Sequence, residues 1–182
     1  GSQEGHSICH VAREFPELKC FSCEGDRKAY AIAKKNLKSQ NSNNVRLIHT
    51  LSPQFLYGLQ TENPDITDSN AVFWLDAHGF GFEWPLRDEL KHILANYKNC
   101  HIVIDDFKVP NRSQFGYDSY NNQECSLEYI GDILSSHKDI KIYLPNYSEV
   151  TSDYNPLRGW VCIQVGNSKS MISDLAFSDR YK

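Results

Sequence analysis

The sequence predicts an α/β protein with a doubly wound, mostly parallel sheet. Apolar runs that end in acids recur along the chain, as in "AVFWLD" and "HIVIDDF", and segments with one apolar helical stripe separate them. Continuous apolar runs are typical of strands covered on both faces, and their alternation with helices indicates a doubly wound sheet. The final two strands have no helix between them, which indicates an antiparallel pair at the sheet edge.

The first half of the chain is predicted to contain three helices and two strands. Asp26 is a suitable N-cap for the second helix, which precedes the second strand. The apolar positions on the first two helices are Ile8, Val11, Ala12, Phe15, Ala29, Ile32, Ala33 and Leu37. The expected elements are a helix over 7–15, a strand over 18–25, a helix over about 26–38, a strand over 44–50 and a short helix from Pro53.

The second half begins with the apolar strand "AVFWLD" and a helix that has Pro85 near its first turn. The apolar stripe of that helix consists of Leu86, Leu90, Ile93, Leu94 and Tyr97. A strand over 100–107 and the helical segment "SLEYIGDIL" follow. The last two strands, "IKIYLPN" and "WVCIQVG", are joined by a turn-rich loop over 145–159.

Composition and charge limit the class of protein. The chain has 182 residues, of which 40% are hydrophobic and 23% charged, and this is typical of one globular domain spanning 1–182. A net charge of −4 argues against a nucleic-acid groove. The densest basic group is expected to be a solvated helix face; it consists of Arg27, Lys28, Lys34, Lys35 and Lys38. The expected partner is a small-molecule substrate rather than nucleic acid or a membrane, and homodimerisation is left open.

Six cysteines occur mostly in apolar runs, where the thiol behaves as a small hydrophobic group. Cys20 and Cys23 form a CxxC within a predicted strand, which places their side chains on opposite faces and argues against a zinc or redox pair. We find no signal peptide and no apolar run of membrane-spanning length. These features favour the reducing cytoplasm.

Acidic side chains follow three of the predicted strands. They are Glu24, Asp76 and the pair Asp105 and Asp106. Open α/β sheets bind ligands beyond the carboxyl ends of their strands. The opening "GSQEGHS" is a glycine-rich loop that leads into a helix, which allows close approach of the backbone to a ligand. The sequence therefore places the ligand site at this edge.

Together these motifs resemble class I S-adenosylmethionine-dependent methyltransferases. "GSQEGHS" resembles the glycine-rich first motif, and "FSCEGDRKAYAIAKKNL" resembles the second, in which an acid accepts hydrogen bonds from both ribose hydroxyls. The resemblance gives that role to Glu24, and it gives Ser52 in "HTLSPQFL" a contact with the adenine. The residues that it implies in cofactor binding are Gly1, Gln3, Gly5, Ser7, Glu24, Gly25, Ser52 and Asp76.

The acids also resemble those of the metal-dependent catechol and macrocin-type O-methyltransferases. In these families, an Asp and an Asp-Asp or Asp-Asn pair at adjacent strand ends hold Mg²⁺. The resemblance gives the metal site to Asp76, Asp105 and Asp106, with Mg²⁺, Ca²⁺ or Mn²⁺ as suitable ions. Taken singly, Asp76 could instead cap a turn, Asp105 could cap a turn or pair with Lys108, and Asp106 could face solvent.

His78 and an aromatic segment complete the candidate site. The catechol-type enzymes use a Lys as base near the first metal-binding Asp, and here His78 takes that role or is a structural hydrogen bonder. Phe115, Tyr117 and Tyr120 lie in a polar loop that follows the paired acids, and they are expected to form a substrate wall or lid, or an ordinary surface loop.

The family's fold begins with a central strand directly before the glycine-rich loop, and Gly1 is already in that loop. We expect an upstream extension of the chain, or another segment, to supply this strand. Alternatively, Gly1 and Ser2 are a cloning remnant. The sequence thus predicts a methyltransferase that acts on a hydroxyl of a small molecule or sugar, with metal assistance. Its rivals are a metal-independent methyltransferase whose acids bind substrate directly, and a non-catalytic binding module.

Overall fold

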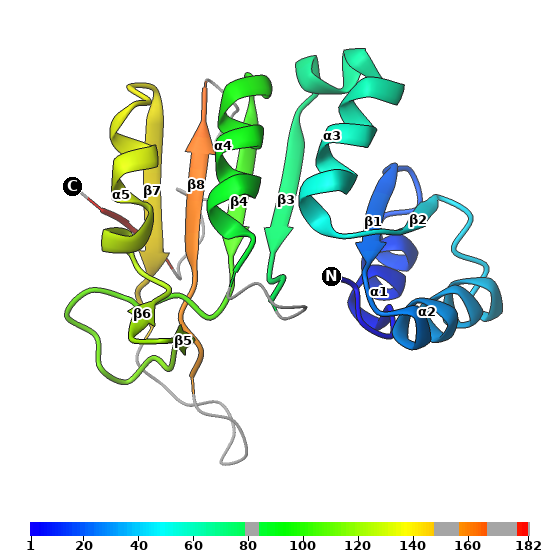
Figure 1. The fold of residues 1–182 in the computed structure, drawn as a ribbon, viewed down its shortest axis with the longest axis horizontal. Helices are drawn as coiled ribbons and strands as arrows, with labels where there is room; N and C mark the ends of the chain where they lie inside the picture. The colour runs from blue at the N-terminus through cyan, green and yellow to red at the C-terminus, as the bar shows by residue number, and fades with distance from the viewer. Residues whose placement is uncertain (79–83, 148–156, 167–177, 182) are drawn as a thin grey trace. The chain divides into compact units, whose positions relative to one another are not determined.

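The computed structural model describes residues 1–78, 84–147, 157–166 and 178–181. The chain divides into two compact units. The first unit comprises Gly1–Glu62 with Ala77–Pro85, and the second comprises Asn63–Asp76 with Leu86–Lys182. Each unit contains its own sheet (Figure 1), and the two are described separately below. The organisation as one functional domain stays a prediction.

The first unit contains two parallel strands and three helices. Strands β1 (Cys20–Glu24) and β2 (Val45–His49) pair in parallel, so that Glu24 and His49 stand opposite each other where the strands end. The helices are α1 (His6–Glu14), α2 (Arg27–Ser39) and α3 (Ser52–Glu62). The predicted N-cap is confirmed, because the Asp26 carboxylate accepts hydrogen bonds from the backbone N–H groups of Lys28 and Ala29.

The buried faces of α1 and α2 differ in part from the prediction. Helix α1 buries Cys9 and Ala12, helix α2 buries Ala33 and Leu37, and the predicted apolar residues Val11, Phe15 and Ile32 are exposed. The contact of the loop before α1 with α2 accounts for the buried Ala33. A Cβ on Gly5 would lie 3.0 Å from the Cβ of Ala33. Such an approach requires small residues at the contact, and the larger side chains turn outward.

The second unit is built on a five-stranded mixed sheet in the order β3-β4-β8-β7-β9. Strands β3 (Ala71–Leu75) and β4 (Cys100–Ile104) are parallel, whereas β7 (Ile140–Pro145), β8 (Val161–Val165) and β9 (Ser178–Tyr181) join through antiparallel pairs. The parallel neighbours and the antiparallel pairing of β7 with β8 are as predicted, and the α/β class is confirmed. The predicted place of that pair at the sheet edge is wrong, because β8 lies beside β4 and β7 lies beside β9. Strand β9 was not predicted.

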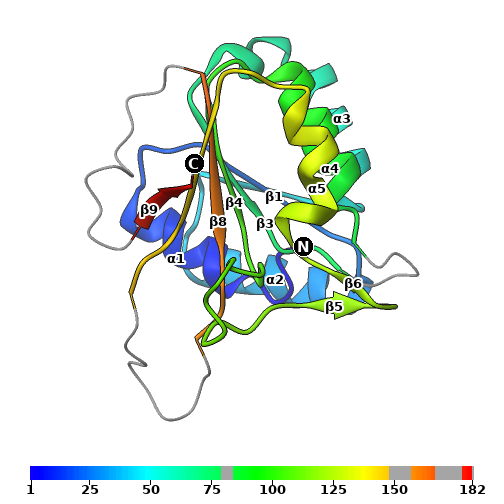
Figure 2. The same ribbon diagram turned by 90° about the vertical axis from the view of Figure 1, so that its left-hand side faces the viewer.

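Helices α4 (Leu86–Asn96) and α5 (Leu127–Ser135) lie on one face of this sheet (Figures 1 and 2). The predicted stripe of α4 is buried throughout, and Leu90 and Ile93 have no exposed surface. Ile102 and Ile163, which pair across β4 and β8, are equally buried. Strand β3 is at the edge of the sheet, and its Val72 and Trp74 side chains are 76% and 64% exposed.

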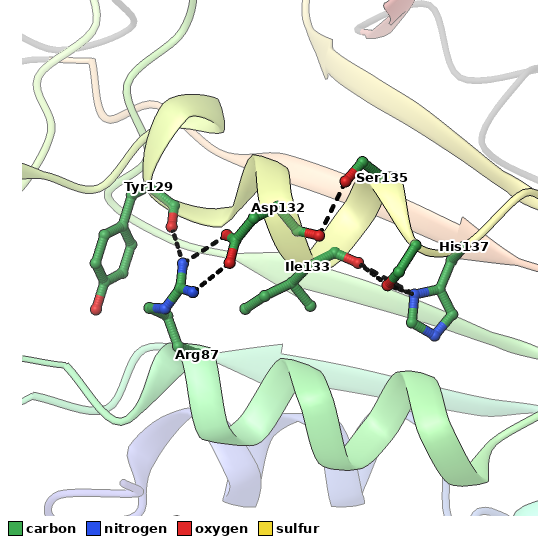
Figure 3. Close-up of polar contacts among 7 residues, drawn as sticks. Arg87, Tyr129, Asp132, Ile133, Ser135 and His137 are labelled. Atoms are coloured by element: carbon green, nitrogen blue, oxygen red, sulfur yellow. Dashed lines mark hydrogen bonds and ion pairs between the residues drawn. The ribbon is translucent and has the colours of Figure 1, made fainter.

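An ion pair joins α4 to α5. Arg87, at the start of α4, donates hydrogen bonds to both carboxylate oxygens of Asp132 on α5, at 2.8 and 2.6 Å, and a further one to the Tyr129 carbonyl (Figure 3). The two parallel hydrogen bonds hold the guanidinium and the carboxylate in one plane. They lower the pKa of Asp132 to about 2.

Short elements precede β3 and follow β4. A 3₁₀-helix, η1 (Pro64–Asp68), precedes β3, and the hairpin of β5 (Ser119–Tyr120) and β6 (Gln123–Glu124) lies in the segment predicted to be a loop. Asn121 and Asn122 form the turn with positive φ angles of 48° and 64°, as type I′ turns require. In the described part of the chain, no helix is long and apolar enough to cross a membrane.

All six cysteines are buried thiols. Three lie in the first unit, and Cys100, Cys125 and Cys162 lie in the second. Burial is the largest cause that raises the pKa of each of these last three thiols to about 12. Cys20 and Cys23 are both buried within β1, as part of the packing of the first unit.

Candidate functional site

The glycine-rich loop of the first unit lies against the end of β1. The backbone N–H of Ser2 donates to the Cys23 carbonyl at 2.9 Å, and the Ser2 carbonyl accepts from the N–H of Gly5 at 2.8 Å. Gly5 caps α1 with a φ of 79°, a left-handed conformation that glycine adopts most readily. The loop is thereby held against the end of β1 and leads directly into α1. Its role as the glycine-rich cofactor motif stays a prediction.

The Glu24 side chain, at the end of β1, lies against this loop. The side chain is buried, with 5% of the residue exposed, and each carboxylate oxygen accepts one backbone N–H. Gln3 donates to Oε2 at 2.6 Å and Asp26 donates to Oε1 at 2.8 Å. A Cβ on Gly1 would lie 2.8 Å from Oε2, so glycine is what permits this approach. The structure therefore brings together three of the predicted cofactor residues: Gly1, Gln3 and Glu24.

The other predicted cofactor residues of the first unit lie on α1, on α3 and next to Glu24 in the chain. Ser7 is exposed in the first turn of α1, and Ser52 begins α3 and is half-buried. The Gly25 carbonyl lies 3.1 Å from Nε2 of His49, whose ring stacks on Tyr30 with centroids 4.9 Å apart. His49 was not predicted from the sequence. The rule that identified the acids at strand ends applies to it as well, because it is the last residue of β2.

The second unit brings four acids to one end of its sheet. The Asp105 N–H donates to the Leu75 carbonyl at 3.1 Å, which ties the end of β4 to the end of β3 just before Asp76. Asp106 has a positive φ of 50°, and its carbonyl accepts from the N–H of Asp118 at 2.9 Å. Asp118 is an acid that sequence reasoning missed, because it lies in the segment expected to be a loop.

The acids contribute to the raised pKa values of two neighbouring side chains. Burial first, then the charges of Asp118, Asp106 and Asp76, raise the pKa of Tyr120. The same acids, together with Asp105, add to the burial that raises the pKa of Cys125. Backbone hydrogen bonds place Cys125 in the same region: its N–H donates to the Asp118 carbonyl at 2.9 Å, and its carbonyl accepts from the N–H of Lys108 at 2.7 Å. Like charges so placed need a compensating cation.

Arg158 supplies that cation. Its Nε lies 2.6 Å from Asp106 Oδ1, and its Nη2 lies 3.1 Å from Asp118 Oδ1. The two carboxylates are 19% and 20% exposed, and the arginine is 47% exposed. Sequence reasoning did not identify Arg158, which lies 40 residues beyond Asp118 in the chain.

The expected metal site does not fit this arrangement. A divalent ion of the Mg²⁺ type needs oxygen ligands that converge on one point. In the parts of the chain that the structure describes, no three His, Cys, Asp or Glu side chains are placed to hold a metal ion. An Asp106 oxygen instead bonds the Arg158 guanidinium. The expected joint role of Asp76, Asp105 and Asp106 as metal ligands is therefore not supported.

The aromatic segment has two different environments. Phe115 is 2% exposed and packs edge-on against Tyr147, with ring centroids 5.3 Å apart, so it has almost no surface to offer a substrate. Tyr117 donates its hydroxyl to Glu124 at 2.8 Å, and Tyr120 is half-buried near the acids. A substrate contact stays a prediction for both tyrosines, whereas Phe115 is a packing residue.

His78 is exposed and is the last described residue before the gap at 79–83. It belongs to the first unit, whereas Asp76 belongs to the second. Its role as a base, and the cofactor contact of Asp76, stay predictions.

Comparison with known proteins identifies the fold. No protein-family model and no curated protein matches the chain. Among solved structures, an O-methyltransferase from Bacillus cereus in complex with SAH has a TM-score of 0.62 at 15% identity, over 91% of this chain and 71% of that one. The precorrin-6y C5,15-methyltransferase from Geobacter metallireducens has a TM-score of 0.55 at 15% identity, over 91% and 77%.

A SAM-dependent methyltransferase from Aquifex aeolicus has a TM-score of 0.52 at 15% identity, over 90% of this chain and 77% of that one. Similarity at this level of identity concerns the fold. The chain therefore has the Rossmann-like α/β fold of the S-adenosylmethionine-dependent methyltransferases, as the sequence predicted.

Proposed function

We propose that the protein is a methyltransferase that uses S-adenosylmethionine and binds it through the glycine-rich loop and Glu24. The observation that carries the proposal is the buried Glu24 carboxylate at the end of β1, which two backbone N–H groups hold in place. Each carboxylate oxygen has two lone-pair directions, so each can accept one ribose hydroxyl in addition to its backbone donor. The fold similarity to methyltransferases supports the same assignment.

The remaining cofactor contacts follow from the position of each residue. The backbone of Gly1, Gln3 and Gly5 is folded against β1, which suits a close approach to the cofactor. Ser7 stands in the first turn of α1, and Ser52 begins α3, where a hydroxyl can meet the adenine.

The proposed reaction is methyl transfer to a hydroxyl group of a small molecule or sugar. The cofactor supplies an electrophilic methyl group on a positively charged sulfur. The acceptor hydroxyl must lose its proton as the new bond between carbon and oxygen forms, and we assign this proton to His78, with Asp76 as the second candidate. Histidine is the side chain that most commonly exchanges protons near neutral pH.

We adopt the metal-independent form of this reaction. A metal-assisted form would need Asp76, Asp105 and Asp106 to converge on one ion, and the pairing of Asp106 with Arg158 argues against it. In the metal-independent form, the acids accept hydrogen bonds directly from acceptor hydroxyls. Tyr120, half-buried beside them, is suited to contact the same acceptor. The buried thiols support a cytoplasmic location, where they stay reduced.

Calorimetric titration with S-adenosylmethionine and with SAH tests the proposal. We expect saturable binding of both by the folded protein, followed by transfer of a labelled methyl group to a member of a panel of catechols and sugars. Absence of binding to either compound, in a protein shown to be folded by circular dichroism, would contradict the proposal. Binding without transfer to any acceptor in the panel would instead favour a non-catalytic binding module.

A further inference from the structure

The acidic end of the second unit has a fixed cation of its own. The Asp105 N–H bonds the Leu75 carbonyl just before Asp76, and the Asp118 N–H bonds the Asp106 carbonyl. Arg158 pairs with two of these four acids, Asp106 and Asp118. A guanidinium has five N–H donors in a rigid fork, which suits it to bridge two carboxylates. Here Nε serves Asp106 and Nη2 serves Asp118.

The backbone around Arg158 is fixed on both sides. Gly116 donates to the Leu157 carbonyl at 2.7 Å and accepts from the N–H of Gly159 at 2.9 Å, so that Gly116 and Arg158 form a β-bridge. The Gly159 carbonyl in turn accepts from the N–H of Phe107 at 2.9 Å. These backbone hydrogen bonds therefore hold the segment around Arg158 between Phe107, which follows Asp106, and Gly116, which lies two residues before Asp118.

Two glycines make this position possible. A Cβ on Gly159 would lie 2.0 Å from the Phe107 carbonyl oxygen, a distance at which the backbone would have to move. A Cβ on Gly116 would lie 3.3 Å from Nη1 of Arg158. Gly159 thus allows the backbone after Arg158 to pass close to Phe107, and Gly116 leaves room beside the guanidinium.

The nearest lysine along the chain is engaged elsewhere. Lys108, two residues after Asp106, pairs with Glu124 at 2.5 Å and lies over the Tyr117 ring at 5.2 Å. Its ammonium group thus contacts the end of β6 and the aromatic segment. Among the described residues, Arg158 is the cation that pairs with both Asp106 and Asp118.

We propose that Arg158 is the resident cation of the acidic cluster and acts as a positioning residue, holding Asp106 and Asp118 where a metal ion would otherwise be needed. A divalent ion must compete with the guanidinium for Asp106. Removing the guanidinium should therefore raise the affinity of the Asp106 and Asp118 carboxylates for a divalent ion. This inference does not rest on cofactor binding or on the methyl acceptor.

The test is a titration with Mn²⁺ alone, followed by electron paramagnetic resonance, on the wild-type protein and on Arg158→Gln. We expect no saturation of the wild type below about 1 mM, and binding by Arg158→Gln that is at least about tenfold tighter. Arg46→Gln is the matched control, because Arg46 is 48% exposed and pairs with the carboxylate of Glu62 in the first unit. It should bind Mn²⁺ no better than the wild type.

A second variant guards against loosening of the loop in Arg158→Gln. Arg158→Lys keeps the positive charge but places it at one point, which can serve one carboxylate well and not two. We expect its Mn²⁺ affinity to lie between those of the wild type and Arg158→Gln. Saturable Mn²⁺ binding by the wild type below about 1 mM would overturn the proposal. So would the finding that neither Arg158→Gln nor Arg158→Lys binds Mn²⁺ more tightly than the wild type.

Discussion

Replacing Glu24 by glutamine changes the proposed cofactor site with almost no change in shape. Each Glu24 oxygen now accepts a backbone N–H, at 2.6 Å from Gln3 and at 2.8 Å from Asp26. An amide has one acceptor oxygen, so one of these N–H groups would face an NH₂ donor. The charge that strengthens hydrogen bonds from the ribose hydroxyls would also be lost.

The size of the effect follows from these contacts. A hydrogen bond to a charged group contributes about 1.5–3 kcal/mol, and each 1.4 kcal/mol is tenfold in affinity. We therefore expect SAH to bind Glu24→Gln roughly 10- to 150-fold more weakly than the wild type. The free energy of unfolding of the first unit should fall by a part of the same amount, because one loop N–H loses its acceptor.

Calorimetry with SAH gives the affinity, and circular dichroism during urea denaturation gives the stability. Glu4→Gln is the matched control, since Glu4 lies in the same loop, its side chain is 53% exposed and its carboxylate contacts His6 at 3.3 Å. This control makes the same change of charge without touching the buried carboxylate, and it should bind SAH normally. An affinity of folded Glu24→Gln within about threefold of the wild type would refute the reasoning.

Three further predictions concern the second unit. Gly159→Ala should lower its stability by about 1–3 kcal/mol in urea denaturation, because of the clash with the Phe107 carbonyl; an unchanged midpoint would contradict that close approach. Arg87→Gln should raise the pKa of Asp132 from about 2 towards 3.8 in a carboxyl NMR titration. Because folding lowers this pKa, the stability from the pair is present above pH 3.8 and is lost as the pH falls towards 2. If Arg87→Gln loses the same stability over this pH range as the wild type does, the ion pair is not the source of the loss. Replacing Mg²⁺ by EDTA should leave the thermal unfolding midpoint unchanged, because Arg158 already neutralises Asp106; a midpoint that rises with Mg²⁺ would indicate a bound ion.

The main helices and strands could be predicted because local patterns determine them. The buried stripe of α4 and the cap at Asp26 follow from side chains close together in the sequence. The outward turn of Ile32 could not be predicted in the same way, since it depends on the contact of Gly5 with Ala33 on another element. The Asn121 and Asn122 turn was a readable signal for the β5–β6 hairpin.

The residues of the candidate site were likewise predictable only in part. Glu24 follows a strand and lies beside Gly1 and Gln3, as the rule for strand ends predicts. The rule also placed Asp76, Asp105 and Asp106 at one end of a sheet. It could not predict the counterion, because Arg158 comes from a distant segment and reaches the acids only through a β-bridge to Gly116.

The six buried thiols can serve as probes of local opening of the protein. Alkylating reagents attack the thiolate, and burial limits their access to all six thiols. Labelling should therefore require a unit to open first. Cys9, Cys20 and Cys23 report on one unit, and Cys100, Cys125 and Cys162 report on the other. Mass spectrometry of the labelled peptides can thus measure the opening rates of the two halves separately in one sample.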